Sequence, residues 1–132
     1  MPQKTCEHLL SKIFLLDKTK MRIIYSKHFP PKDFGAINLL GLIIVRKDYG
    51  TLSEAEKNHE QIHTRQMQEM LIVLFYLCYI LEWLIRLIQY KNRLRAYENI
   101  SFEREAYSQM YDPSYLKKRK LFAFRSYYKK KE

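Results

Sequence analysis

The residues best suited to chemistry are two histidines spaced four apart, with a glutamate directly after the first, in the segment His59-Glu60-Gln61-Ile62-His63. On a helix, residues four apart share one face, so both imidazoles can bind one ion. Glu60 lies beside that face, where a carboxylate can take a proton from a water in the open coordination position of the ion. The pattern predicts a zinc centre with Glu60 as general base, as peptide-bond hydrolysis requires. The alternative is two solvent-facing histidines on an amphipathic helix.

A third ligand is expected downstream, because the other two histidines, His8 and His28, both precede the motif. Glu103 and Glu105 are the candidates. Residues two apart on a helix face about 200° away from each other, so only one of them can reach the ion. Ala106 lies three residues after Glu103 on nearly the same face, where a small side chain lets two helices approach closely. We therefore predict Glu103 as the third zinc ligand, against the alternative that both glutamates are solvated surface residues.

The helix that carries the motif has a recognisable start and no interruption. Ser53 followed by Glu56 is a capping box, and acidic residues occupy the first turn. Neither glycine nor proline occurs within residues 51–112, so this stretch can be almost continuously helical. We predict an active-site helix over about 53–80 and a returning helix over about 84–110.

The two histidines must meet a carboxylate that lies forty positions after the second one, across an apolar run at 71–88 in which only Glu82 and Arg86 are charged. A single membrane crossing by this run would put the ligands on opposite sides of the bilayer, so a crossing and the zinc site exclude each other. We expect instead a helical hairpin that reverses near residues 82–83, with a reversal at 91–92 as the alternative. The run would then be protein core or a monotopic membrane insertion.

The remaining sequence predicts a small β element and a basic tail. Residues 1–20 carry apolar positions at helical spacing, residues 21–25 are typical of a short strand, and residues 36–45 of a second strand interrupted by one glycine. The fold class is therefore α+β, mostly α, with the β element packed on the active-site helix. We expect a single metallopeptidase-like domain over 1–112 and a basic tail over 113–132.

The motif and its downstream glutamate resemble the gluzincin metallopeptidases, especially the prenyl-protein (CAAX) protease and BlaR-type antirepressor branches. Those families carry HExxH on one helix and a glutamate in an E-x-x-A-D context on a later one. Here residues 103–107 form E-x-x-A-Y, which places the ligand on Glu103 and has Tyr107 where the families have aspartate. Gln66 extends the motif to HExxHxxQ, a variant seen in some bacterial members.

The resemblance covers roughly residues 34–107 and implies that the strand at 36–45 could pair with an extended peptide by β-augmentation. An oxyanion stabiliser is also required, and Tyr97, Tyr107 and Tyr111 are available for it. We therefore predict a zinc-dependent metallopeptidase that acts on a peptide or protein substrate. The alternative is a non-catalytic zinc-stabilised helical module that binds a partner or a membrane surface.

The formal charge is +10, and eight of the Lys and Arg residues fall within residues 117–131. Together with the 71–88 run, such a tail can contact an anionic membrane surface, or it can simply aid solubility. No nucleic-acid fold signature accompanies it, so we do not expect nucleic acid as a partner. Cys6 and Cys78 form no disulfide framework, and no signal peptide is recognisable. We expect a cytoplasmic protein, peripheral or monotopic at the inner face of the membrane.

Overall fold

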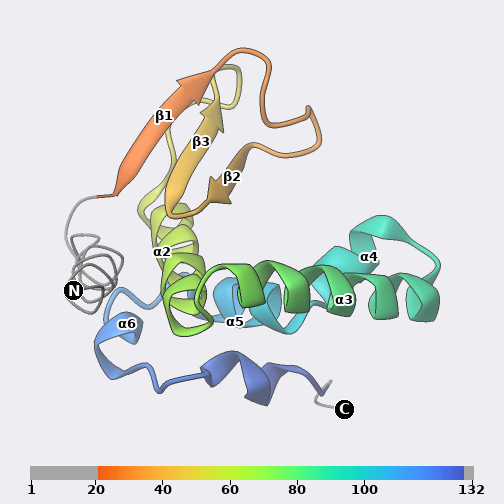
Figure 1. Ribbon diagram of the computed structural model, residues 1–132. Coiled ribbons are helices and arrows are strands. Elements are labelled where there is room, and N and C mark those ends of the chain that lie inside the picture. The colour runs from red at the N-terminus through yellow and green to blue at the C-terminus, as the bar shows by residue number, and fades with distance from the viewer. Residues whose placement is uncertain (1–20, 130–132) are drawn as a thin grey trace, which may run out of the picture.

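The computed structural model describes residues 21–129, in which a small sheet is followed by a set of helices (Figure 1). This confirms the α+β, mostly α fold class. The helix expected within residues 1–20 lies outside the described residues. In chain order the elements are β1 (Arg22–Ser26), β2 (Ala36–Leu39), β3 (Leu42–Arg46), α2 (Glu54–Glu69), α3 (Val73–Tyr90), α4 (Arg93–Glu98), α5 (Ser101–Gln109), α6 (Tyr115–Lys118) and the 3-10 helix η1 (Ala123–Tyr127).

The sheet has the strand order β1-β3-β2, with β1 parallel and β2 antiparallel to the central strand β3. In place of the single strand expected over 36–45, the chain forms a hairpin that reverses at Leu40 and Gly41. Both residues have positive φ, 54° and 83°, as a type I′ hairpin turn requires, and glycine adopts such a value without a steric penalty. The strand expected over 21–25 is confirmed as β1.

One side chain of β2 fastens the sheet to α2. Asn38 Nδ2 donates to the backbone oxygen of Glu60 at 2.9 Å and to Thr64 Oγ1 at 3.0 Å. Its Oδ1 accepts from the Gly41 backbone N–H at 2.9 Å, which also fixes the hairpin turn. Because each polar atom of the amide has a partner, the nearly buried side chain is stable there. The β element therefore packs on the motif-bearing helix, as expected.

The start of α2 is the predicted capping box. Ser53 Oγ accepts from the backbone N–H of Glu56 at 3.2 Å, and Glu56 Oε2 accepts from the backbone N–H of Ser53 at 2.7 Å. Two backbone N–H groups that have no partner within the helix are satisfied in this way.

The helix expected over 53–80 is divided in two after Met70. The Ile72 N–H donates to the Met67 carbonyl at 2.8 Å, which is the Schellman bond that closes many helices. Leu71 then holds a φ of 54°, a value that glycine usually supplies at this position. Met67 and Met70 belong to one buried apolar cluster with the start of α3, so packing offsets the unfavourable backbone conformation. The chain therefore leaves α2 in a new direction.

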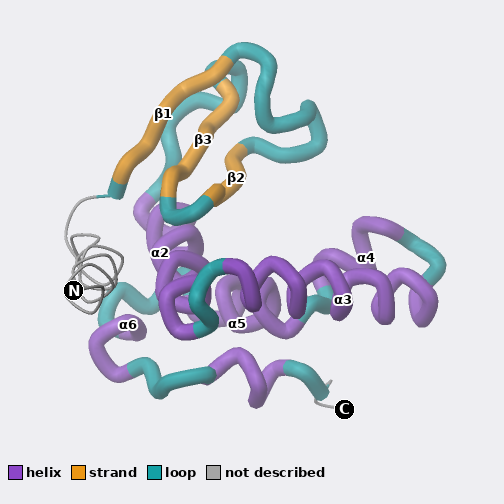
Figure 2. Tube along the Cα trace, viewed as in Figure 1, coloured by secondary structure: helices purple, strands orange, loops and turns teal. Residues whose placement is uncertain are grey.

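The reversal of the hairpin comes at Lys91 and Asn92, the alternative position, and not near residues 82–83, because α3 runs uninterrupted to Tyr90. The backbone of Lys91 is in the left-handed conformation, with a φ of 52°. Asn92 Oδ1 then caps α4 by accepting a hydrogen bond from the Arg95 N–H at 3.0 Å. The returning segment, expected over about 84–110, is α4 followed by α5 and runs back along α3 (Figure 2). This return brings α5 against α2.

Described residues of the predicted tail pack on the helices. The ring of Phe124 in η1 lies 4.3 Å from the ring of Phe102 in α5, measured between centroids. Arg119, whose side chain is 1% exposed, forms ion pairs with Glu105 and Glu69. The domain boundary at residue 112 stays a prediction, but the segment as far as η1 contributes to the same core.

Candidate metal centre

The three predicted ligand side chains meet at the contact between α2 and α5. His59 Nε2 lies 3.0 Å from His63 Nε2. The two carboxylate oxygens of Glu103 lie 3.3 Å from these nitrogens, Oε2 beside His59 and Oε1 beside His63. All three residues are buried, and one ligand atom from each lies within 4.8 Å of the others. The chain therefore contains a buried His-His-Glu cluster that could hold a metal ion.

A small residue at the contact explains the close approach of α2 and α5. Ala106 of α5 is 0% exposed and packs against Ile62 of α2, which is also 0% exposed. Ala106 shares a face with Glu103, and Ile62 lies directly before His63 in the chain. A larger side chain at position 106 would separate the two helices and move the carboxylate away from the imidazoles. The small side chain of Ala106 thus allows the close helix approach expected from the sequence.

The arrangement fits a zinc ion in both spacing and donor chemistry. In a tetrahedral zinc site with bonds of about 2.0–2.1 Å, neighbouring ligand atoms lie about 3.3 Å apart, close to the spacings here. Among the described residues, Glu103 Oε2 is buried without a hydrogen-bond partner. Two imidazole nitrogens and a carboxylate that converge in a buried space require a proton or a metal ion between them. A His-His-Glu set is a common zinc donor set.

The hydrogen bonds of Gln66 fix the tautomer of His63. Gln66 Nε2 faces two acceptors, the Phe102 carbonyl at 3.1 Å and Glu105 Oε2 at 3.0 Å, so this atom must be the amide nitrogen. The amide oxygen then lies 2.8 Å from His63 Nδ1, which must carry a proton. The His63 Nε2 lone pair is therefore left for an ion. The sequence drew attention to Gln66 as an extension of the motif but did not predict this role.

Without a metal ion, the charges of the cluster favour a protonated His63. Burial alone would lower the pKa of His63, but the charge of Glu103 and the hydrogen bond to it outweigh burial and raise the pKa to about 9. Burial likewise opposes ionisation of Glu103, but the adjacent imidazoles hold the pKa of its carboxyl well below the ordinary range. At neutral pH the cluster is therefore an ion pair, and a metal ion must displace the proton of His63 in order to bind.

Glu60 has the environment of a general base. Burial raises the pKa of its carboxyl, although His63 and His59 oppose the rise. Its Oε2 is buried and has no hydrogen-bond partner among the described residues. Asn38 and Thr64 both donate to the Glu60 carbonyl, which holds the backbone at this point. A carboxylate with an unused oxygen and a raised pKa is well suited to accept a proton from water.

Tyr79 of α3 is a site residue that the sequence reasoning missed. Its hydroxyl donates to Glu103 Oε1 at 2.7 Å and so orients the carboxylate. Burial, followed by the charge of Glu103, raises the pKa of Tyr79 well above its ordinary value, so the hydroxyl keeps its proton. The available signal was helical periodicity, because Tyr79 lies one turn after Phe75, which is buried in the core.

Of the three tyrosines expected near the site, Tyr107 has a ring that contacts a ligand residue. Its ring packs edge-on against His59 with centroids 4.5 Å apart, and its hydroxyl lies 3.5 Å from the Tyr97 hydroxyl. Tyr111 is 80% exposed and is least suited to the task. Tyr107 stands where the resembled families have aspartate, and His59 Nδ1 has no hydrogen-bond partner among the described residues. The first histidine is thus held by packing and the second by hydrogen bonds.

Glu105, which the sequence did not predict as a ligand, binds side chains of the C-terminal segment. It is 0% exposed and accepts hydrogen bonds from Gln66, the Tyr115 hydroxyl and the Arg119 guanidinium. Arg119 also pairs with Glu69 at the end of α2. This network joins the C-terminal segment to the amide that orients His63.

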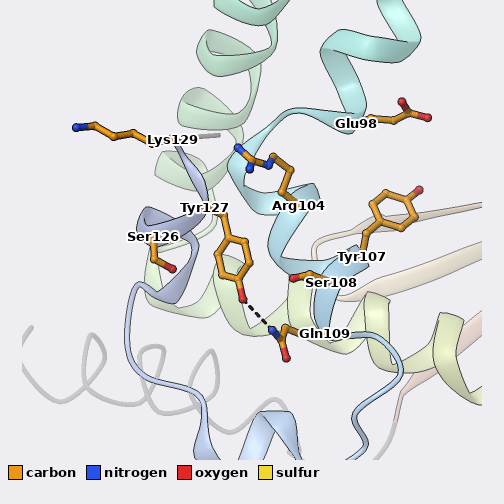
Figure 3. A pocket seen from close by; sticks show the side chains of 8 residues that line it. All are labelled: Glu98, Arg104, Tyr107, Ser108, Gln109, Ser126, Tyr127 and Lys129. Atoms are coloured by element: carbon orange, nitrogen blue, oxygen red, sulfur yellow. Dashed lines mark hydrogen bonds between the residues drawn. The ribbon is translucent and has the colours of Figure 1, made fainter. Parts of the chain in front are cut away.

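A cavity of about 870 Å³ lies between α5 and the C-terminal segment (Figure 3). Arg104, Ser108 and Gln109 line it from α5, and Gln109 Nε2 donates to the Tyr127 hydroxyl at 2.9 Å. None of the three ligand residues lines this cavity, which shares only Tyr107 with the surroundings of the cluster. The cavity and the metal cluster are therefore separate features.

No family model matches the chain, and no curated protein and no solved structure matches it either. The likeness to gluzincins therefore rests on the HExxH motif, the E-x-x-A segment and the buried cluster they form.

Proposed function

We propose that this chain is a zinc-dependent metallopeptidase-like hydrolase that cleaves peptide bonds. The observation that carries the proposal is the convergence of His59, His63 and Glu103 in one buried cluster, beside a glutamate whose carboxylate has an unused oxygen. A bound zinc ion would polarise the scissile carbonyl and lower the pKa of a water. The identity of the metal and the reaction are both part of the proposal.

Each residue has a defined task in such a reaction. Glu60 accepts a proton from the attacking water and returns it to the leaving amine. Tyr79 keeps the Glu103 carboxylate in place through its hydroxyl. The Tyr107 hydroxyl, with Tyr97 behind it, is the best placed donor to an oxyanion beside His59. The raised pKa of Tyr107, due first to burial, keeps this donor protonated at neutral pH.

The strand order restricts where an extended peptide could pair within the 36–45 segment. The central strand β3 is already paired on both sides, so within the 36–45 segment the outer edge of β2 is the part left for an added strand. Part of that edge is occupied, because the Asn38 carbonyl accepts from the Tyr76 hydroxyl at 3.3 Å. We propose that an extended peptide pairs along the part of β2 that precedes Asn38.

The decisive experiment combines metal analysis with cleavage of a labelled, unfolded protein substrate. Glu60→Gln should keep one zinc per chain and lose about 10²–10⁴-fold in kcat/KM, because the base is removed while the ligands remain. Glu54→Gln is the matched control, since the Glu54 side chain lies in the same helix and is 90% exposed. If Glu60→Gln kept both full zinc occupancy and unchanged activity, Glu60 would not be the catalytic base.

One observation favours a second candidate function. His59 Nδ1 has no hydrogen-bond partner among the described residues, and Tyr107 replaces the aspartate of the resembled families. The second candidate is accordingly a non-catalytic module in which zinc stabilises the fold. A zinc-dependent rise in melting temperature without any zinc-dependent cleavage would select it over the hydrolase.

A further inference from the structure

The two faces of α3 differ sharply in polarity. Its exposed side includes six large aliphatic residues, each three or four positions from another of the set, which we call the outer face: Leu74, Leu77, Leu81, Leu84, Ile85 and Ile88. This spacing forms a single stripe along the helix. The two charged residues of α3, Glu82 and Arg86, are buried on the opposite side. The outer face therefore contains no charge over the whole length of the helix.

The inward charges are fixed by partners, so α3 cannot roll to hide its apolar stripe. Glu82 accepts from the Ser101 backbone N–H at 2.8 Å and from Ser101 Oγ at 2.6 Å, which caps the start of α5. Arg86 pairs with Glu82 and lies over the ring of Tyr128, 4.8 Å from its centroid. Turning the helix would break these buried contacts, which is strongly unfavourable.

The fold also determines how this helix can meet a membrane. Among the described residues, α3 is the one helix long and apolar enough to cross a bilayer, and 17% of it is buried within the protein. However, His63 precedes α3 and Glu103 follows it, and the two belong to one cluster. Both ends of α3 must therefore stay on the same side of the bilayer. The helix can lie along a lipid surface, but as placed here it cannot cross.

Two exposed cations lie at the C-terminal end of α3, where the outer face ends. Lys91 and Arg93 are exposed directly after α3. The chain as a whole carries a charge of +10. An apolar stripe that ends at exposed cations complements a surface of acyl chains beneath anionic headgroups.

We propose that the outer face of α3 binds an anionic lipid surface, with the helix lying in the plane of the membrane. The six aliphatic side chains of the outer face insert into the boundary between headgroups and acyl chains, and Lys91 and Arg93 contact the headgroups. The inference does not rest on zinc chemistry, because it depends only on the exposed apolar stripe and the charges around it.

Co-flotation of the full chain with vesicles tests the proposal. Vesicles of phosphatidylcholine containing phosphatidylglycerol should bind the protein, and vesicles of phosphatidylcholine alone should bind it at least about tenfold more weakly. Ile88→Asp alters a side chain that is 77% exposed, and Leu77→Asp/Leu81→Asp alters the middle of the outer face. Binding should weaken at least about tenfold for each aliphatic residue replaced. Equal binding by Ile88→Asp and the unchanged protein would overturn the proposal.

Tyr111→Asp is the matched control for an exposed side chain remote from α3. Asn58, near the start of α2, donates to the carbonyls on either side of Tyr111, whereas α3 follows the end of α2. This variant should bind vesicles as the unchanged protein does. Zinc content and helical circular dichroism check that each variant folds. A lipid-free dimer that dissociates on Ile88→Asp substitution, together with no vesicle binding, would assign the outer face to a second copy of the chain and overturn the proposal.

Discussion

The metal cluster and the outer face of α3 reverse the usual distribution of side chains. At the cluster, two imidazoles and a carboxylate are buried; Gln66 accepts a hydrogen bond from His63, and the Tyr79 hydroxyl donates one to Glu103. On the outer face, six aliphatic residues are open to solvent with no polar partner. Buried charge is tolerable only when it is paired or coordinates a metal, and an exposed apolar stripe of this size usually marks a binding surface.

The cluster and the outer face both depend on how α3 is oriented in the fold. α3 presents Tyr79 and Glu82 to the protein and the aliphatic stripe to the outside. The polar contacts on its inner side orient Glu103 and cap α5, and the same contacts fix which side faces outward. Substitutions on the inner side should therefore affect metal binding and stability, whereas substitutions on the outer face should leave both unchanged.

The largest effect is expected for Glu103→Ala, which removes the carboxylate of the ligand set. Stoichiometric zinc should be lost, and added zinc should no longer raise the melting temperature. Elemental analysis after dialysis measures zinc per chain. Glu54→Ala, at an exposed position of α2, should keep the zinc of the unchanged protein. One firmly held equivalent in Glu103→Ala would contradict the assignment of this ligand.

Tyr79→Phe should have a smaller but clear effect, because it deletes only the hydroxyl that orients Glu103. Zinc affinity should fall about 10–100-fold while the fold is retained. Competition with a chelator of known affinity provides the measurement. Tyr90→Phe removes a hydroxyl from the same helix that contacts Asn99, and it should bind zinc normally. Equal affinities in the two variants would show that the hydroxyl of Tyr79 does not support the ligand.

The pH dependence of the metal-free protein should reveal the ion pair in the cluster. The pKa of His63 is raised from its ordinary 6.5 to about 9, so its contribution to stability is complete below pH 6.5 and is lost as pH rises toward 9. The pKa of Glu103 is lowered from its ordinary 4.5, so its contribution is complete above that pH and is lost as pH falls. With a chelator present, the contribution of the pair should be greatest between pH 4.5 and 6.5.

Melting temperatures with chelator and with zinc across this range test the expectation. The stabilisation given by zinc should grow from pH 6.5 to 9, because fewer protons compete for His63. His63→Gln should abolish the fall in stability of the metal-free protein above pH 6.5. A fall of the same size in that variant would mean that another group causes it.

The smallest effect is expected on the outer face of α3. Leu81→Gln should change the free energy of unfolding by no more than about 0.5 kcal/mol in the absence of lipid, because Leu81 is 59% exposed. Phe75→Ala, on the inner side of the same helix, should cost about 3–5 kcal/mol, because Phe75 is 2% exposed. Urea unfolding measures both values. A cost near 3 kcal/mol for Leu81→Gln would show that this side is packed within the protein.

Much of the cluster could be predicted because its features are local in the sequence. The capping box joins Ser53 to Glu56, and the two histidines lie one helical turn apart, so helix geometry alone relates them. The choice of Glu103 over Glu105 also followed from one turn of helix, through the small Ala106. A sequence specifies relations of this kind within any helix, whatever surrounds it.

Tertiary structure decided the features that join residues far apart in the chain. The sequence showed Glu82 and Arg86 as the charged residues of the apolar run, but only packing brought Glu82 to the start of α5. The break after Met70 carries no glycine or proline, and it exists because a buried cluster stabilises an unfavourable backbone conformation. Gln66 and Tyr79 could be assigned no partners in advance for the same reason. Which donor meets which acceptor depends on how α2, α3 and α5 pack, and that depends on the whole core at once.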